Sequence, residues 1–237
     1  MALILNIETS TEVCSVTLAE NGNLVVLKES SEGFNHSKSL TVFIEEIFKD
    51  NNLKINTLDA VAVSKGPGSY TGLRIGVSVA KGLCYGLNIP LISVCSLEMM
   101  AVHTALNLEK YVSERNSLPF LFCPMIDARR MEVYTALYNT GGKEIRTVTA
   151  EIIDENFLSE LFDTHQILIF GNGAGKCKGL VNHKNAIFAG PSETSAQFMQ
   201  AISEVKFKKQ EFEDVAYFEP FYLKNFVATI PKDKILK

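Results

Sequence analysis

The sequence predicts an α/β protein made of two similar halves. Apolar, strand-like runs alternate with patterns of helical period along the chain, and each half opens with three strands before its first helical segment. Hydrophobic residues make up 46% of the 237 residues, which is ample for a packed core. We therefore expect one large domain or two smaller ones that share a junction.

Strand and turn signals define the first half. Residues 3–8 and 13–20 are apolar runs, and Asn21-Gly22 is a hairpin signal that leads into a returning strand over 24–28. The elements expected after this hairpin are an amphipathic helix over 40–48, a strand over 58–63, a helix over 70–87, a short strand over 91–94 and a helix from residue 96.

The second half repeats this order of elements. Its first strand covers 120–126 and ends at Asp127. The elements expected after it are strands over 133–138 and 145–149, a helix over 154–162, a strand over 167–170 and a glycine loop over 171–176.

The two halves align when the first is shifted by ~120 residues, which places Val13 on Val133 and Gly22 on Gly142. A meander of three strands followed by crossover helices is the ribonuclease-H-like half of actin-type proteins. The sequence therefore predicts a duplicated ribonuclease-H-like architecture of the actin-like ATPase type, with mixed sheets. We expect an N-terminal domain over 1–105 and a C-terminal domain with a tail over 106–237.

Composition excludes several classes of protein. The net charge is −4, without the basic surplus of a protein that holds a phosphate backbone by itself. No apolar run reaches the roughly 18 residues that a membrane span needs, and the first ten residues lack the basic region of a secretory signal. The five cysteines are dispersed without a CxxC pair, which is typical of reduced thiols, so we expect a cytoplasmic protein.

A glycine turn and the helix after it carry the main functional signal. Gly66-Pro67-Gly68 follows a buried strand, and Ser69 can cap the next helix. Small residues then recur every four positions, at Gly72, Gly76, Ala80 and Cys84. Each glycine inside a helix costs roughly 1 kcal/mol relative to alanine, so we expect another segment to approach this stripe closely. That segment is either the chain's own helix over 40–48 or a helix of another chain.

Acidic residues at two strand ends suggest a weaker candidate site for a nucleotide. Glu8 ends the first strand of one half and Asp127 the first strand of the other, so the two can face each other across a cleft. The alternative is that both acids cap turns. The candidate nucleotide-binding residues are Glu8, Thr9, Ser10, Asp127, Gly171 and Gly173.

The sequence lacks other signals of catalysis. Three residues, not four, separate Gly171 from Gly175, and Cys177 stands where a Walker loop needs a hydroxyl. The four histidines form no i, i+4 pair and no HExxH motif, so we expect no metal site and no cofactor.

Four segments in chain order resemble the TsaB family, also called YeaZ: ILNIETST, LDAVAVSKGPGSYTGLRIGVSVAKGL, PMIDARRMEVYTALY and FEPFYLKN. The GPGSYTGLRIG part is highly specific, although Tyr70 replaces the usual phenylalanine. The resemblance implies an actin-like two-domain fold and a role in making threonylcarbamoyladenosine at position 37 of tRNA. It implies a non-catalytic dimerisation subunit that partners a TsaD-type catalytic subunit, with a TsaE-type ATPase in the larger assembly. A homodimer and an indirect contact with tRNA also follow from it.

The resemblance also bears on catalysis and on the binding surface. Catalytic relatives carry His-x-x-x-His where this sequence has Ser96 and Met100, and neither residue can replace an imidazole ligand. An actin-like ATP-dependent kinase and a glycoprotease-like metallopeptidase are the alternative functions. In this family the two helices of the first half look like the partner surface. The expected partner-binding residues are Leu40, Phe43, Ile47, Tyr70, Gly72, Leu73, Gly76, Val77, Ala80, Leu83 and Cys84.

Overall fold

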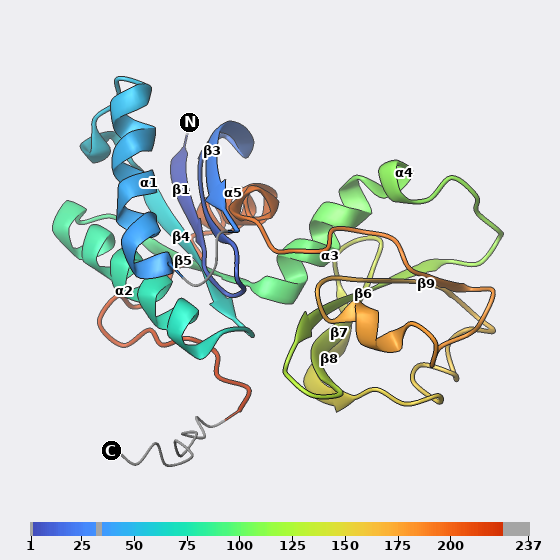
Figure 1. Cartoon of the computed structure of the whole chain (residues 1–237). Helices are drawn as coiled ribbons and strands as arrows, with labels where there is room; N and C mark the ends of the chain where they lie inside the picture. The colour runs from blue at the N-terminus through green and yellow to red at the C-terminus, as the bar shows by residue number, and fades with distance from the viewer. Residues whose placement is uncertain (1, 32–34, 225–237) are drawn as a thin grey trace, which may run out of the picture.

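The computed structural model describes residues 2–31 and 35–224 (Figure 1). Within these residues the strands form two five-stranded sheets, with the orders β3-β2-β1-β4-β5 and β10-β9-β6-β7-β8. Both sheets place the first strand of their half in the centre, with the antiparallel meander on one side and the parallel strands on the other. The duplicated ribonuclease-H-like architecture predicted from the sequence is thereby confirmed.

The elements of the first half lie close to their predicted positions. They are β1 (Leu3–Glu8), β2 (Cys14–Glu20), β3 (Asn23–Ser30), α1 (His36–Asp50), a 3₁₀ turn (Ile55–Thr57), β4 (Ala60–Gly66), α2 (Tyr70–Leu87), β5 (Leu91–Cys95) and α3 (Ser96–Leu106). The helix predicted over 70–87 is confirmed at both ends, and the Ser69 side chain accepts the predicted capping hydrogen bond from the Gly72 N–H at 3.2 Å.

The second half contains the predicted strands, which are β6 to β9 in the list below, and further elements that the sequence pattern does not indicate. It contains α4 (Leu108–Tyr111), β6 (Phe120–Asp127), β7 (Glu132–Asn139), β8 (Glu144–Ile152), β9 (Gln166–Phe170), β10 (Ala186–Ile187), α5 (Gln200–Lys208) and 3₁₀ turns at Ala174–Cys177 and Ala196–Phe198. The equivalent hairpins of the two halves turn alike, with φ +76° at Gly22 and +75° at Gly142.

The helix predicted over 154–162 is wrong, because the chain forms consecutive turns there. The Asp154 carboxylate accepts a hydrogen bond from the Asn156 N–H at 2.9 Å, and Leu158 adopts a left-handed φ of +60°. An aspartate that bonds the backbone two residues later favours a turn over a helix. The turns still bury Phe157 and Phe162, so this segment covers the second sheet as a helix would.

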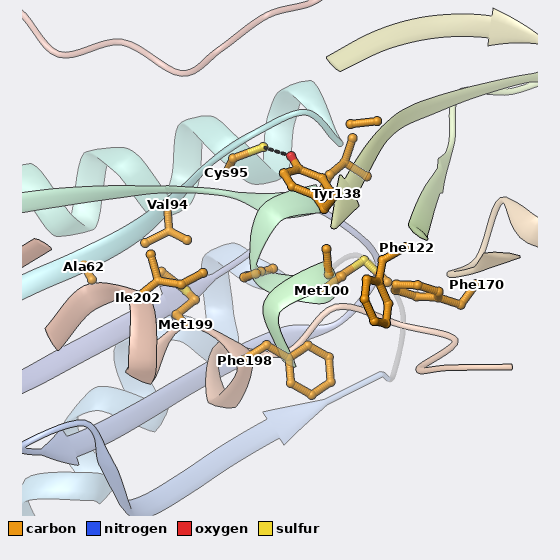
Figure 2. Close-up of a cluster of buried hydrophobic side chains, with 14 of the residues drawn as sticks. Ala62, Val94, Cys95, Met100, Phe122, Tyr138, Phe170, Phe198, Met199 and Ile202 are labelled. Carbon is orange, nitrogen blue, oxygen red and sulfur yellow. Dashed lines mark hydrogen bonds between the residues drawn. The ribbon is translucent and has the colours of Figure 1, made fainter. Parts of the chain in front are cut away.

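Helices cover both faces of the first sheet. Contacts of α1 and α2 bury one face, which presents Leu5 and Val63, while α5 lies on the opposite face (Figure 1). Although α5 comes late in the sequence, its residue Ile202 packs with Val94 of β5 (Figure 2). The same continuous core includes Met100 of α3, which lies against the second sheet. The division at residues 105 and 106 stays a prediction, and the two halves share this core.

The predicted glycine stripe of α2 packs inside the chain. A Cβ at Gly72 would lie 2.1 Å from the Thr9 carbonyl oxygen, and one at Gly76 would lie 2.3 Å from the Thr9 hydroxyl oxygen. The Thr9 hydroxyl donates a hydrogen bond to the Gly72 carbonyl at 2.8 Å. Close approach is therefore confirmed, but its main neighbour is the turn after β1, with His36 of α1 beside it.

We expect Gly72→Ala to lower the free energy of unfolding by about 1–3 kcal/mol, because its new methyl group would collide with the Thr9 backbone. The methyl group of Gly82→Ala, in the same helix, would meet no atom of the described residues within 4 Å, so this variant should raise the free energy of unfolding by up to about 1 kcal/mol. Urea unfolding of both variants measures the difference. Equal changes in the two would contradict the packing described above.

Candidate functional site

A cleft lies between the two halves and holds a cavity of about 600 Å³. Its walls come from the turn after β1, from the N-terminal end of α2, from the turn after β6 and from the C-terminal segment near residue 222. The lining includes Ser10 and Asp127, two of the candidate nucleotide-binding residues. The structure therefore brings the strand ends of both halves together, as the sequence predicts.

Glu8 is fully buried, and it is absent from the cavity lining. One of its carboxylate oxygens accepts a hydrogen bond from the Ser10 N–H at 2.5 Å. Burial raises the pKa of the Glu8 carboxyl to about 7 from its ordinary 4.5, although hydrogen bonds from Ser10 oppose the shift. Thr9 is also buried, and its hydroxyl is used by the contact with Gly72.

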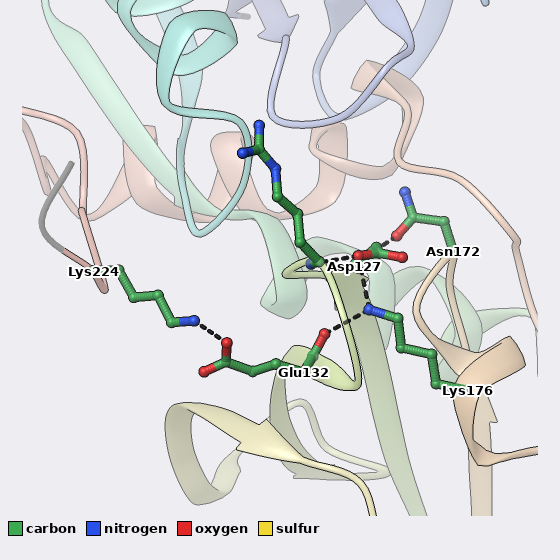
Figure 3. Close-up of polar contacts among 6 residues, drawn as sticks. Asp127, Glu132, Asn172, Lys176 and Lys224 are labelled. Carbon is green, nitrogen blue, oxygen red and sulfur yellow. Dashed lines mark hydrogen bonds and ion pairs between the residues drawn. The ribbon is translucent and has the colours of Figure 1, made fainter. Parts of the chain in front are cut away.

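Asp127 is neutralised by a lysine of its own half. Its carboxylate accepts hydrogen bonds from the Lys176 ammonium at 2.8 Å and from the Arg129 N–H at 2.6 Å (Figure 3). The same ammonium donates to the Glu132 carbonyl at 2.7 Å, and the Asn172 side chain accepts from the Asp127 N–H at 2.8 Å. The network fixes the turn after β6 and places an ammonium where a bound cation would otherwise balance this carboxylate.

The glycines of the loop over 171–176 serve close packing. A Cβ at Gly171 would lie 2.1 Å from the Met125 carbonyl oxygen, and one at Gly173 would lie 3.0 Å from the Val133 side chain. The loop thus rests on β6 and β7 and delivers Lys176 to Asp127.

Most of the expected partner-binding residues are buried within the chain. Buried positions are Leu40, Ile47, Gly72, Leu73, Gly76, Val77, Ala80 and Cys84, while Phe43, Tyr70 and Leu83 are half-buried. Side chains that hold α1 and α2 on the first sheet leave little surface for a second protein. The part of these two helices that stays exposed is their outward face.

The outward face of α2 carries small residues with open space in front of them. Ser78, Gly82 and Gly86 lie four residues apart and are exposed. A Cβ at Gly82 or Gly86 would meet no atom of residues 2–31 and 35–224 within 4 Å. Tyr85, at the same end of the helix, has 86% of its surface exposed.

The chain resembles known proteins over most of its length. A family model described as TsaD, tRNA N6-adenosine threonylcarbamoyltransferase, matches residues 30–158. Relatives named tRNA threonylcarbamoyladenosine biosynthesis protein TsaB, from Haemophilus influenzae and Escherichia coli, are each 29% identical, over 95% of this chain and 94% and 96% of those proteins. A TsaB of Buchnera aphidicola is 31% identical, over 67% of this chain and 68% of that protein. The chain belongs to the TsaB family.

A solved structure agrees with this assignment at the level of the fold. YeaZ from Pseudomonas aeruginosa superposes with a TM-score of 0.77 at 23% identity, covering 94% of this chain and 100% of that one. The predicted resemblance to the TsaB family, over the whole chain, is therefore confirmed.

The TsaB-family chain buries Ser96 and Met100, which the sequence predicts at the histidine positions of catalytic relatives. Ser96 has no exposed surface, and Met100 lies in the shared core beside Phe122 and Phe170 (Figure 2). Over residues 2–31 and 35–224, no group of three or more His, Cys, Asp or Glu side chains is placed to hold a metal ion. In the same ranges, every helix is too short or too polar to cross a membrane.

Sequence reasoning missed the outward stripe of this TsaB-family helix. The four-residue spacing of Ser78, Gly82 and Gly86 was available as a signal, since it repeats the spacing of the buried stripe. The two stripes differ only in which of them faces Thr9, and the sequence does not show that difference.

Glu8→Gln should change how stability depends on pH. The unfolded carboxyl titrates near 4.5 and the folded one near 7, so the parent protein loses stability as pH rises through this window, by on the order of 3 kcal/mol. The neutral amide removes that loss, so the variant should match the parent near pH 4 and exceed it at pH 8. Denaturant unfolding across this range measures the difference. Glu12→Gln, at an exposed neighbour, is the control, and parallel curves for Glu8→Gln and its parent would contradict the expectation.

Proposed function

We propose that this chain is a non-catalytic partner subunit that supports a TsaD-type catalytic subunit in threonylcarbamoyl transfer to adenosine 37 of tRNA. The observation that carries the proposal is the outward face of α2, where two helical glycines face open space. A helix interior loses about 1 kcal/mol for each glycine, and no contact within the described chain explains Gly82 or Gly86. A partner helix that approaches closely along this face would explain both.

The rest of the face suits a helical partner. Ile75, Val79 and Leu83 form a half-buried apolar row beside the small residues, and all three pack on the core under α1 and α2. From α1, Phe43 is half-buried on the same core, and Val42 has 46% of its surface exposed. An apolar row beside a groove of small residues allows ridges of one helix to enter grooves of another.

The family match supports a TsaD-type subunit as the protein that supplies that helix. The TsaD model aligns with residues 30–158, a range that contains both α1 and α2. A TsaD-type subunit therefore has an equivalent pair of helices, and two equivalent pairs can pack together about a local two-fold axis. A second copy of this chain would use the same face when the TsaD-type subunit is absent. A TsaE-type ATPase joins the larger assembly in this proposal.

The surroundings of three residues support a non-catalytic role. Met100 is packed in the core, Glu8 is buried, and Asp127 is paired with Lys176. These contacts do not favour the kinase or the metallopeptidase. The net charge of −4 supports an indirect contact with tRNA, in which the partner subunit makes most of the contacts with the nucleic acid. In this proposal the complex acts in the cytoplasm.

Gly82→Leu tests the interface without breaking the fold. Since the new side chain enters open space in the isolated chain, we expect the melting temperature to stay the same or rise by a few degrees. Copurification with a tagged TsaD-type subunit should fall at least tenfold, because a leucine would separate the two helices. Gly175→Leu, at another glycine where an added Cβ would meet no atom of the described part of the chain within 4 Å, is the matched control and should copurify normally.

If Gly82→Leu copurifies with the TsaD-type subunit as well as the parent does, the proposed interface is wrong. Loss of the TsaD-type subunit by the Gly175→Leu control would show that the assay responds to any added leucine. The melting temperatures of the two variants separate a loss of binding from a loss of folding.

A further inference from the structure

The C-terminal part of the described chain crosses from one half of the molecule to the other. We call residues 213–224 the strap. It follows α5, runs along α2 and ends beside the second half (Figure 1). The strap makes several contacts with the first half and an ion pair with the second half.

Several hydrogen bonds hold the strap to the first half. The Glu213 N–H donates to the Leu91 carbonyl at 2.9 Å, so the strap pairs with β5 at the open edge of the sheet. The Lys81 ammonium donates to the carbonyls of Ala216 and Phe218 at 3.1 and 3.0 Å. These contacts fix the first part of the strap along α2.

The end of the strap lies across the cleft. The Phe221 N–H donates to the Lys65 carbonyl at 2.7 Å. The Tyr222 ring lies 4.7 Å from the Tyr70 ring of α2, centroid to centroid, and its hydroxyl accepts from the Arg74 guanidinium at 3.3 Å. On the far side of the cleft, the Lys224 ammonium pairs with Glu132 at the start of β7 (Figure 3).

Phe221 lines two cavities between the halves. It lines the cavity of about 600 Å³ described above and also a second cavity of about 450 Å³. The second cavity lies between the end of β4, the start of α3 and the hairpin of β7 and β8, and its lining includes Cys95 and Tyr138. The strap therefore borders both cavities, which we call the first and the second chamber.

We infer that the strap is a latch that holds the cleft closed and releases at its Lys224 end. The many contacts with the first half act as the fixed end. The ion pair between Lys224 and Glu132 is partly exposed at both residues, and such pairs are worth little. Opening therefore begins at this pair, continues with the departure of Phe221 and exposes the second chamber. This device is independent of the proposed partner role.

Cys95 supplies a built-in reporter of the open state. Only 8% of its surface is exposed, and burial raises the pKa of its thiol, so it should react slowly while the latch is closed. Cys123 and Cys177 are buried in the separate core of the second sheet and serve as internal references.

The experiment measures the alkylation rate of each cysteine by mass spectrometry under native conditions with iodoacetamide. Lys224→Gln should raise the rate at Cys95 about threefold, which is the scale of an exposed ion pair. Phe221→Ala should raise it about tenfold, since it removes a large side chain from a residue that borders both chambers. The rates at Cys123 and Cys177 should not change. Lys184→Gln, at an exposed lysine of the second half, is the matched control and should leave every rate unchanged.

A charge exchange sharpens the test. Lys224→Glu alone should raise the rate at Cys95, and adding Glu132→Lys should return it towards the parent value. The latch is overturned if Lys224→Gln and Phe221→Ala both leave the Cys95 rate unchanged. It is also overturned if all five cysteines speed up together, because that result reports global unfolding.

Discussion

The close contact between Thr9 and α2 determines how the first half is assembled. Thr9 lies in the turn after the central strand, and only residues without a side chain let α2 approach its backbone at Gly72 and Gly76. The contact seats the N-terminal end of α2 beside the cleft and turns one side of the helix inward. The opposite side, with Gly82 and Gly86, is left facing outward. Burial of Glu8 follows from the same turn, because its carboxylate bonds the backbone of Ser10.

The two halves deal differently with the negative charge of the acid that ends their central strand. Each ends its central strand with an acid at the position where the fold brings two turns together. In the first half that acid is withdrawn into the interior, where its pKa rises to about 7. In the second half it stays at the cleft and is balanced by Lys176 from the neighbouring loop. Both solutions remove an unbalanced negative charge from the cleft without a bound cation.

The sequence predicted the fold well where a signal is local. Strand runs, the Asn21-Gly22 turn and the Ser69 cap all act over a few residues, and α2 begins and ends where its pattern indicates. The segment over 154–162 was mispredicted because the bond between Asp154 and the Asn156 N–H outweighs helical periodicity. The candidate site was harder to predict. Spacing shows that a glycine permits close approach, but only the tertiary structure shows that Gly72 lies against Thr9, while an added Cβ at Gly82 would have no neighbour within 4 Å among the described residues.

The crossing of α5 has a consequence for the halves as separate molecules. Met199 and Ile202 cover the inner face of the first sheet, although they lie about a hundred residues beyond its last strand. A fragment cut after residue 105 would expose the apolar surface of β4 and β5 that these residues shield, and the complementary fragment would carry Met199 and Ile202 without their support. Such surfaces promote aggregation. The two halves therefore share part of their core, and a chimera that exchanges one sheet with that of a relative should keep α5 with the sheet that it covers.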